Sequence, residues 1–351
     1  MEKTDIVSMT YEELENYVTE VLQEKRFRAK QIYEWLHVKL AGDFDQMTNL
    51  SKALREKLKA ACRIPEMTIV DLLVSEIDGT RKYLFQLEDG SVIESVLMKY
   101  KHGNSVCISS QVGCRMGCRF CASTLGGLER QMSAGEMLRQ VYEIQKESGE
   151  RVSNVVMMGT GEPLDNYDQA VRFLRMISDE KGLNISQRNL TLSTCGLVPQ
   201  IYRLADEKLA ITLAISLHAS NDETRREMMP VAKTYAIQEI LDACRYYYEK
   251  NGRRITFEYS LARGVNDSPQ AADALGRLLK GFMWHVNLIP INPVKERSFV
   301  QSDGESVVKF KNMLEKYGGN VTIRREMGRD IQAACGQLRR RYMDKSGKKE
   351  V

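Results

Sequence analysis

The spacing of apolar residues predicts helices in the first part of the chain. From Tyr11 to about Leu58, apolar residues recur every three or four positions in the runs YEELENYVTEVLQ, AKQIYEWLHVKL and SKALREKLKAA. This spacing places them on one face of a helix. Thr10 precedes the first run and Asn49 or Ser51 precedes the third, and these residue types commonly cap helix N-termini. We therefore expect a small helical domain at the N-terminus.

A shorter period follows. From about Met67 to Lys99 the chain contains TIVDLLVSEIDGTRKYLFQLEDGSVIESVLM, in which apolar and polar residues tend to alternate. The pairs Asp78-Gly79 and Asp89-Gly90 separate the alternating runs and are strong turn signals. This segment is predicted to be a β-meander.

From Ser105 onward, short apolar runs alternate with longer amphipathic ones. Strands are predicted at SVCISS, VSNVVMMG, RNLTLST, LAITLAISLH, ITFEYSL, HVNLIPIN and VTIRRE. The runs between them, such as AGEMLRQVYEIQKE and AIQEILDACRYYYEK, have helical spacing. Continuously apolar strands such as VVMM are typical of parallel strands covered on both faces. Six βα units and a last short strand predict an α/β fold with a partial barrel, because a closed barrel of this type needs eight units.

These patterns divide the chain into four parts. The predicted boundaries are 1–65 for the helical domain, 66–101 for the meander extension, 102–336 for the barrel core and 337–351 for a basic tail. The net charge is +4, and the excess of positive charge is unevenly placed, with basic clusters in this tail and in the run EKRFRAKQ of the helical domain. Such clusters suit an RNA phosphate backbone, although a solvated basic surface would have the same composition.

Composition narrows the class of protein. The 351 residues are 43% hydrophobic and 28% charged, which is ordinary for a globular enzyme. The start MEKTDIVSMTYEELE has no apolar h-region, and no run approaches the length of a membrane span, so we expect a cytoplasmic protein. Eight cysteines, three of them clustered, do not form a disulfide scaffold in a chain of this length. They indicate a reducing compartment and metal or redox chemistry.

The clustered cysteines carry the most specific signal. Cys114, Cys118 and Cys121 have the spacing C-x-x-x-C-x-x-C within GCRMGCRFCAS. Three thiolates can hold a [4Fe–4S] cluster and leave one iron without a protein ligand. That open position suits the amino and carboxylate groups of S-adenosylmethionine (SAM), and the spacing is the radical SAM signature. The alternative is a structural zinc site with Cys107 as the fourth thiolate, although zinc sites usually combine two separated pairs.

Polar motifs follow several predicted strands. In a barrel the carboxyl ends of the strands meet at one mouth, where chemistry gathers. Glycines in GTGEP allow close approach of a ligand, and Glu162 offers a carboxylate to an ammonium group. The predicted SAM-binding residues are Gly161, Glu162, Ser193, Ser216, Leu217, His218 and Asn292.

Two further cysteines are expected near the mouth. Cys335 follows the last predicted strand, and Cys107 lies in the strand that leads to the cysteine loop. If both reach one pocket, they can pair transiently as a disulfide. The alternative is two buried structural thiols, which is the reading we give to Cys62, Cys195 and Cys244.

Taken together, these motifs resemble one family. The runs IESVLM, SVCISSQVGCRMGCRFCAST, GEPLDN, SLHA, GVNDS, HVNLIPINP, VTIRRE and AACGQL are similar to those of the RlmN family over nearly the whole chain. These radical SAM enzymes methylate carbon 2 of adenosine 2503 in 23S rRNA, before full ribosome assembly, and of adenosine 37 in some tRNAs. The resemblance therefore implies a radical SAM barrel, an RNA-binding role for the helical domain, and a monomer supplied with electrons by a donor such as flavodoxin.

The resemblance also implies roles for single residues. Cys335 matches the methyl carrier, an S-methylcysteine intermediate, so that each turnover uses two SAM molecules. Cys107 matches the thiol that releases the product by forming a disulfide with Cys335. Glu94 matches the proton acceptor, and Cys107 is a competing candidate for that role. Cys195 departs from the small residue usual in the family, but Ser193 is retained.

Three alternatives stay open. The closest is the sister activity on adenine carbon 8, in Cfr-type rRNA methyltransferases, against which the Glu162-Pro163 pair and the IPINP run favour carbon 2. The second is a radical SAM enzyme that acts on a peptide or metabolite, which would not need both Cys107 and Cys335. The third is a zinc-containing RNA-binding module without enzymatic activity.

Overall fold

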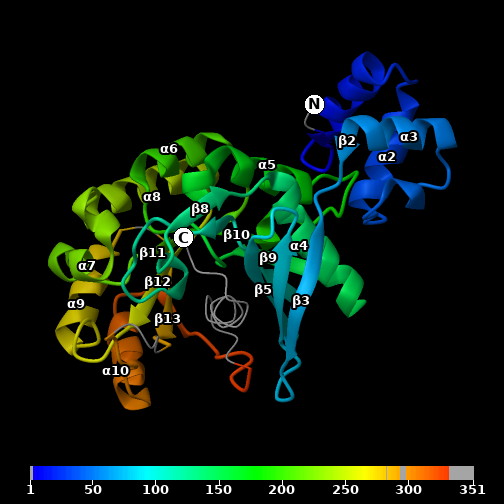
Figure 1. The fold of residues 1–351 in the computed structure, drawn as a ribbon. Helices are drawn as coiled ribbons and strands as arrows, with labels where there is room; N and C mark the ends of the chain where they lie inside the picture. The colour runs from blue at the N-terminus through cyan, green and yellow to red at the C-terminus, as the bar shows by residue number, and fades with distance from the viewer. Residues whose placement is uncertain (1–2, 282, 293–297, 332–351) are drawn as a thin grey trace.

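A large mixed sheet forms the centre of the molecule. The computed structural model describes residues 3–281, 283–292 and 298–331, and Figure 1 shows their arrangement. The sheet has ten strands in the order β14-β13-β12-β11-β10-β9-β6-β5-β4-β3. Their bounds are β3 Met67–Val74, β4 Arg81–Leu87, β5 Val92–Tyr100, β6 Gly103–Cys107, β9 Val152–Met157, β10 Leu190–Thr194, β11 Thr212–Ser216, β12 Ile255–Leu261, β13 Trp284–Pro290 and β14 Asn320–Ile323.

The sheet has a parallel part and an antiparallel part. Strand β6 and strands β9 to β14 run parallel, and β3 to β5 form the predicted antiparallel meander, whose last strand also pairs antiparallel with β6. Gly79 and Gly90 have positive φ in the two turns of the meander, as the Asp-Gly pairs predict. The partial α/β barrel with a meander extension is therefore confirmed.

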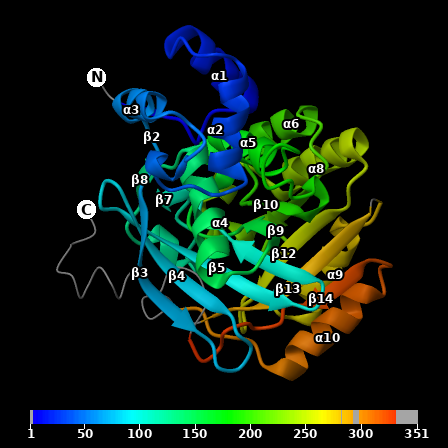
Figure 2. The ribbon, with the colours of Figure 1, turned by 90° about the vertical axis from the view of Figure 1, so that its right-hand side faces the viewer.

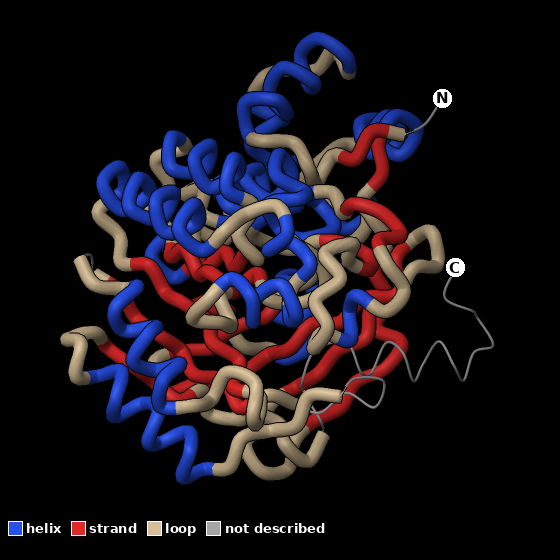
Figure 3. Tube along the Cα trace, turned by 90° about the vertical axis from the view of Figure 1, so that its left-hand side faces the viewer, coloured by secondary structure: helices blue, strands red, loops and turns tan. Residues whose placement is uncertain are grey.

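Helices cover the outer face of the parallel part (Figure 3). Each crossover between its strands contains at least one of them: α4 Ala134–Ser148, α5 Tyr167–Ile177, α6 Val198–Asp206, α7 Asp222–Met228, α8 Ile237–Asn251, α9 Pro269–Leu278 and α10 Gly304–Glu315. Local sequence sets their ends. Helix α4, for example, begins at a capping box of Ser133 and Glu136 and ends at Gly149, which has a φ of 66°. None of the helices in the described residues is long and apolar enough to cross a membrane.

The N-terminal part is helical with one difference from the expectation. It contains α1 Tyr11–Asn16, the π-helix η1 Tyr17–Val21, α2 Phe27–His37 and α3 Lys52–Ala61. Thr10 caps α1 in a capping box with Glu13, and Ser51 rather than Asn49 caps α3. The first run is not one regular helix, because its second half widens to a π-helix and Gln23 then takes a positive φ. A short parallel pair of β1 (Thr4–Asp5) and β2 (Cys62–Arg63), which the sequence did not indicate, joins the two ends of this part.

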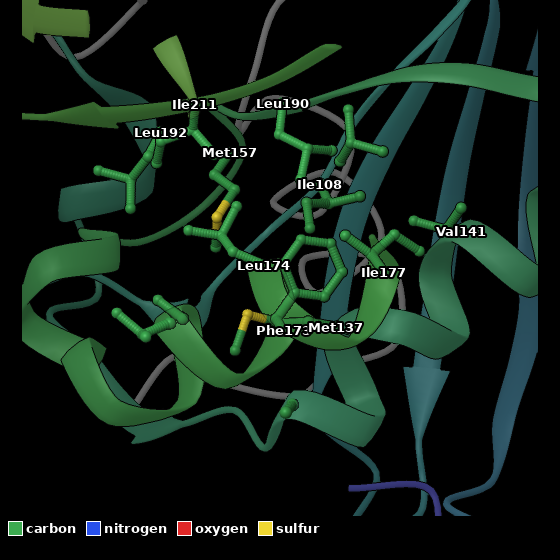
Figure 4. Packing of buried hydrophobic residues seen from close by; sticks show 14 of the residues in the cluster. Ile108, Met137, Val141, Met157, Phe173, Leu174, Ile177, Leu190, Leu192 and Ile211 are labelled. Atoms are coloured by element: carbon green, nitrogen blue, oxygen red, sulfur yellow. The ribbon is translucent and has the colours of Figure 1, made fainter. Parts of the chain in front are cut away.

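One hydrophobic core extends through both the helical part and the barrel. Figure 4 shows Phe173 and Leu174 of α5 and Val141 of α4 packed among residues such as Leu190 and Leu192 of β10. The N-terminal helices are hydrogen-bonded to α4 and to the turn that follows α5. Tyr33 donates a hydrogen bond to Asp179 (3.1 Å), and His37 Nδ1 lies 2.8 Å from the Tyr142 hydroxyl. The core thus holds the strands in register and fixes where their carboxyl ends meet.

Candidate active site

The carboxyl ends of the parallel strands surround a cavity of about 710 Å³. Among the predicted site residues, its lining includes Glu94, Cys107, Cys114, Cys118, Cys121, Gly161, Glu162, Ser193, Ser216, His218 and Asn292. Leu217 is fully buried in the apolar core instead and does not line the cavity. Cys335 lies outside the described residues.

A small two-stranded sheet frames the cysteine loop. Strand β7 (Gln111–Gly113) precedes the loop and pairs with β8 (Leu128–Gln131), which follows it. The loop closes where the Cys114 N–H donates to the Gly127 carbonyl (2.6 Å). A Cβ on Gly113 would lie 2.1 Å from that carbonyl oxygen, and Gly113 has a φ of 75°, so only glycine fits there. The sequence therefore builds a tight loop that points its cysteines to one side.

The three loop thiols lie close to one another. Burial, followed by the neighbouring Cys121, raises the pKa of Cys114 to about 12, and burial again dominates the raised pKa of Cys118. Cys114 and Cys118 therefore hold their protons near pH 7, and a metal must displace these protons on binding. Burial also raises the pKa of Cys107, to about 11.

This arrangement does not support the zinc alternative. A zinc ion needs four donors at about 2 Å from one point. Among residues 3–281, 283–292 and 298–331, no three His, Cys, Asp or Glu side chains are grouped as a single ion requires. The thiolates of a [4Fe–4S] cluster each bind a different iron and do not converge on one point. Three neighbouring thiols that line one cavity fit the cluster.

Glu162 is held rigidly beside the thiols. Its Oε1 accepts a hydrogen bond from the Leu164 N–H (3.0 Å) and its Oε2 accepts one from the Cys195 N–H (2.7 Å). Burial raises its pKa, so a cation in the cavity would stabilise the ionised form. Gly161 lies next to it with a φ of 109°, and a Cβ there would lie 2.7 Å from the Gln111 Cβ. Gly161 therefore packs tightly against Gln111, and the fixed carboxylate of Glu162 beside it on the cavity lining suits an ammonium group.

His218 is held in one orientation and contacts the cysteine loop. Its Nδ1 accepts a hydrogen bond from the Ser260 N–H (2.9 Å), which assigns the neutral tautomer with the proton on Nε2. Burial, helped by Arg225, lowers the pKa of His218 to about 3, so it stays neutral near pH 7. Its ring contacts the edge of Phe120 with centroids 4.8 Å apart. Phe120 immediately precedes Cys121, so this contact orients the cysteine loop against the end of β11.

Glu94 and Cys107 lie on adjacent strands of the cavity wall. Val96 on β5 pairs with Cys107 on β6, so Glu94, two residues before Val96, is on the same face and diagonal to Cys107. Glu94 forms an ion pair with Lys82 on β4, at 3.2 Å from Nζ to Oε2. The two side chains are only 2% and 1% exposed. A carboxylate, an ammonium group and a thiol are therefore gathered on one buried face of the meander.

Comparisons with known proteins agree with this geometry. The family model "Ribosomal RNA large subunit methyltransferase N-terminal domain" matches residues 4–64, and the model "Radical SAM superfamily" matches residues 108–275. A protein of Lachnoclostridium phytofermentans named "Probable dual-specificity RNA methyltransferase RlmN" is 62% identical, with 100% of this chain and 98% of the relative covered. One of the same name from Clostridium novyi is 54% identical, with 97% and 98% covered. The chain belongs to the RlmN family.

A solved structure extends the comparison to three dimensions. A radical SAM methyltransferase from Sphaerobacter thermophilus is 43% identical to this chain and superposes with a TM-score of 0.91, covering 95% of this chain and 98% of its own. The chain is thus a radical SAM enzyme, and the superfamily implies a [4Fe–4S] cluster and SAM. The donor set fits these groups, because three neighbouring thiols and the fixed carboxylate of Glu162 line one cavity.

Sequence reasoning missed two charged residues of this RlmN family member. The position of Lys82 opposite Val96 could have been predicted from the sequence, because the turn at Asp89-Gly90 fixes the register in which β4 pairs with β5. Glu258, in the fully buried strand β12, also lines the cavity and accepts a hydrogen bond from the Asn287 side chain (2.9 Å). Burial raises its pKa, and the nearby Arg324 opposes this shift. The sequence did carry a signal for Glu258, because it is the one carboxylate in the otherwise largely apolar run ITFEYSL.

Proposed function

We propose that the chain methylates carbon 2 of adenine in RNA, at adenosine 2503 of 23S rRNA and adenosine 37 of tRNA. The observation that carries this proposal is one cavity lined by the three clustered thiols and, on the meander face, by Glu94 and Cys107. The three clustered thiols suit radical SAM chemistry, while Glu94 and Cys107 supply a base and a thiol. The names of the RlmN relatives support RNA as the substrate.

In this proposal the loop and the strand ends hold the cofactors. Cys114, Cys118 and Cys121 hold the cluster, which together with SAM supplies a carbon-centred radical able to abstract hydrogen. Glu162, next to Gly161, accepts the amino group of SAM. The remaining SAM contacts are assigned to Ser193, Ser216, His218 and Asn292, and Leu217, which is buried in the core, supports Ser216 and His218 on either side of it in the chain.

Cys335 is proposed as the methyl carrier. Carbon 2 of adenine is electron-poor and does not attack the methyl group of SAM directly, so the methyl group must first be held on a nucleophile of the protein. Two SAM molecules are then used per turnover, one to methylate the carrier and one for radical chemistry. Residues 324–329 line the cavity, and Cys335 follows them closely in the chain, which supports this role.

Glu94 is the better candidate for the proton acceptor. Burial raises the pKa of Cys107 to about 11, so this thiol carries its proton near pH 7 and is a poor base. Glu94 is a carboxylate that lines the cavity and forms an ion pair with Lys82 at 3.2 Å. We therefore assign proton removal to Glu94 and product release, through a disulfide with Cys335, to Cys107.

The test is product analysis under anaerobic conditions. The reconstituted protein is incubated with SAM, a reductant such as reduced flavodoxin, and a 23S rRNA fragment or tRNA, and the nucleosides are identified by mass spectrometry. We expect 2-methyladenosine from the wild type and none from Cys335→Ala. Formation of 8-methyladenosine would instead establish the sister activity. SAM cleavage without RNA modification in the wild type would refute the assigned substrate.

A further inference from the structure

After its last strand the chain crosses the cavity. Arg324 continues the register of β14 by donating its N–H to the Leu288 carbonyl (2.8 Å). Residues 324–329 then all line the cavity, and residues 330 and 331 follow. We call residues 324–331 the strap. Figures 1 and 2 both show it, in red, running to the tip of the hairpin formed by β3 and β4.

The end of the strap is bonded to that hairpin. Asp330 Oδ1 accepts a hydrogen bond from the Ser75 hydroxyl (2.6 Å), and Asp330 Oδ2 accepts one from the Glu76 N–H (2.9 Å). Two residues earlier, the Gly328 N–H donates to Asp78 Oδ2 (2.9 Å). Three hydrogen bonds to carboxylates thus join segments about 250 residues apart in sequence.

The hairpin turn is built to receive the strap. It is closed by hydrogen bonds of its own, from the Ser75 N–H to the Thr80 carbonyl (2.8 Å) and from the Thr80 N–H to Asp78 Oδ1 (3.0 Å). Burial raises the pKa of Asp78, but hydrogen bonds from Gly328 and Thr80 outweigh it and bring the pKa to about 2. The hydrogen bond from Ser75 likewise lowers the pKa of Asp330. Both carboxylates are therefore ionised near pH 7, where hydrogen bonds to them are strongest.

The strap connects the two edges of the large sheet. Strands β14 and β3 are the two edges of the ten-stranded sheet. The strap leaves one edge, lines the cavity between them and is fastened near the other. Because a trans chain spans at most about 3.6 Å per residue, Cys335 lies no more than about 18 Å along the chain from the anchored Asp330. The hairpin therefore limits where the segment that follows the strap can go.

We propose that the β3–β4 turn is an anchor that holds the strap across the cavity and so sets the point from which the chain continues to Cys335, with Ser75, Asp78 and Asp330 as positioning residues. The meander extension then has a role in catalysis besides carrying Glu94. This inference rests on the proposed function, since it assumes that Cys335 is the methyl carrier.

The test compares Asp330→Ala with two matched variants. Asp330→Ala removes two of the three anchoring hydrogen bonds and leaves those within the turn intact. Glu76→Ala removes a charge from the same exposed turn but keeps the backbone N–H that Asp330 uses, so it is the control. Asp330→Asn keeps an acceptor oxygen and should restore part of the function.

Two readouts separate anchoring from the reaction itself. Hydrogen–deuterium exchange of the peptide covering residues 324–331 reports docking without any activity. The ratio of 5′-deoxyadenosine formed to adenosine methylated reports positioning of the carrier. In Asp330→Ala we expect exchange to be faster and the ratio to rise by roughly tenfold, the effect of losing about one net hydrogen bond to a charged group. Glu76→Ala should match the wild type in both, with an unchanged melting temperature in all variants.

Either of two results would overturn the anchor. One is exchange in Asp330→Ala equal to that of the wild type, which would mean that the turn does not hold the strap. The other is faster exchange with an unchanged ratio, which would mean that docking does not position the carrier. Failure of the proposed function looks different, because the wild type itself would then form no 2-methyladenosine.

Discussion

The ion pair of Lys82 and Glu94 is the most consequential contact at the scale of single residues. Both side chains are almost completely buried, and they lie beside Cys107 on one face of the meander. A buried pair stabilises the fold little as a whole, but removal of one partner leaves an uncompensated charge. The pair therefore links the stability of the meander to the chemistry proposed for Glu94.

A first prediction concerns that link. Lys82→Met should lower the free energy of unfolding by about 3–5 kcal/mol, because the Glu94 carboxylate loses its ammonium partner in a buried setting. The double variant Lys82→Met/Glu94→Gln should recover a large part of this loss. Urea unfolding of wild type, both single variants and the double variant provides the measurement. Additive effects of the two substitutions would show that the ion pair is not coupled.

A second prediction concerns His37, which is buried against Tyr142. Burial lowers the pKa of His37 to about 3, so between that value and the ordinary histidine pKa near 6.5 only the unfolded chain binds the proton. Stability should therefore fall as the pH falls through this window, by about 1.4 kcal/mol per pH unit for this group. His37→Gln should reduce the slope of unfolding free energy against pH, measured between pH 6 and 5, by about that amount. An unchanged slope would mean that His37 titrates normally.

At the scale of elements, the sequence predicted well what depends on local pattern. The period of apolar residues located the helices, the Asp-Gly pairs located both meander turns, and Thr10 was correctly expected as a cap. Contacts between distant segments escaped prediction. The docking of Asp330 on Ser75 joins residues 255 apart, and no local pattern encodes such a pairing. The same holds for the candidate site. The motif residues were predicted and line the cavity, but Lys82, the partner of Glu94, was not predicted because its place depends on how β4 pairs with β5.

A third prediction belongs to the cysteine loop and its framing strands β7 and β8. Gly113→Ala should prevent closure of the loop, because the new Cβ would meet the Gly127 carbonyl oxygen at 2.1 Å. Iron and sulfide content after reconstitution should fall severalfold. Gly127→Ala is the control, since Gly127 has a similar φ of 71° but open space at its Cβ position. Equal iron content in Gly113→Ala and wild type would show that the loop does not need this closure.

At the scale of the whole molecule, the helical part and the barrel share one hydrophobic core. Deletion of the first 65 residues would therefore expose apolar surface of the barrel as well as remove basic side chains. The predicted role of the helical part in RNA binding is better tested by single substitutions on its surface. Lys25 and Lys30 are exposed there, on either side of the start of α2.

A fourth prediction follows from those two lysines. The double variant Lys25→Ala/Lys30→Ala should bind RNA more weakly and reduce the slope of log affinity against log salt by about 1–2, because phosphate contacts release counterions. Formation of 5′-deoxyadenosine without RNA should not change. Lys309→Ala is the control, since Lys309 is an exposed lysine of α10 paired with Glu305. If the slope of log affinity against log salt is equal in all three proteins, these lysines of the helical part do not contact RNA.

The central claim is that RNA, Cys107 and Cys335 meet in the cavity at the strand ends. The most direct measurement is mass spectrometry of Cys107→Ala after one reaction cycle, because this variant lacks the thiol proposed to release the product. We predict a covalent adduct between adenosine and the peptide containing Cys335, absent from wild type and from Cys107→Ala/Cys335→Ala. Normal turnover of Cys107→Ala with no adduct on Cys335 would contradict the account.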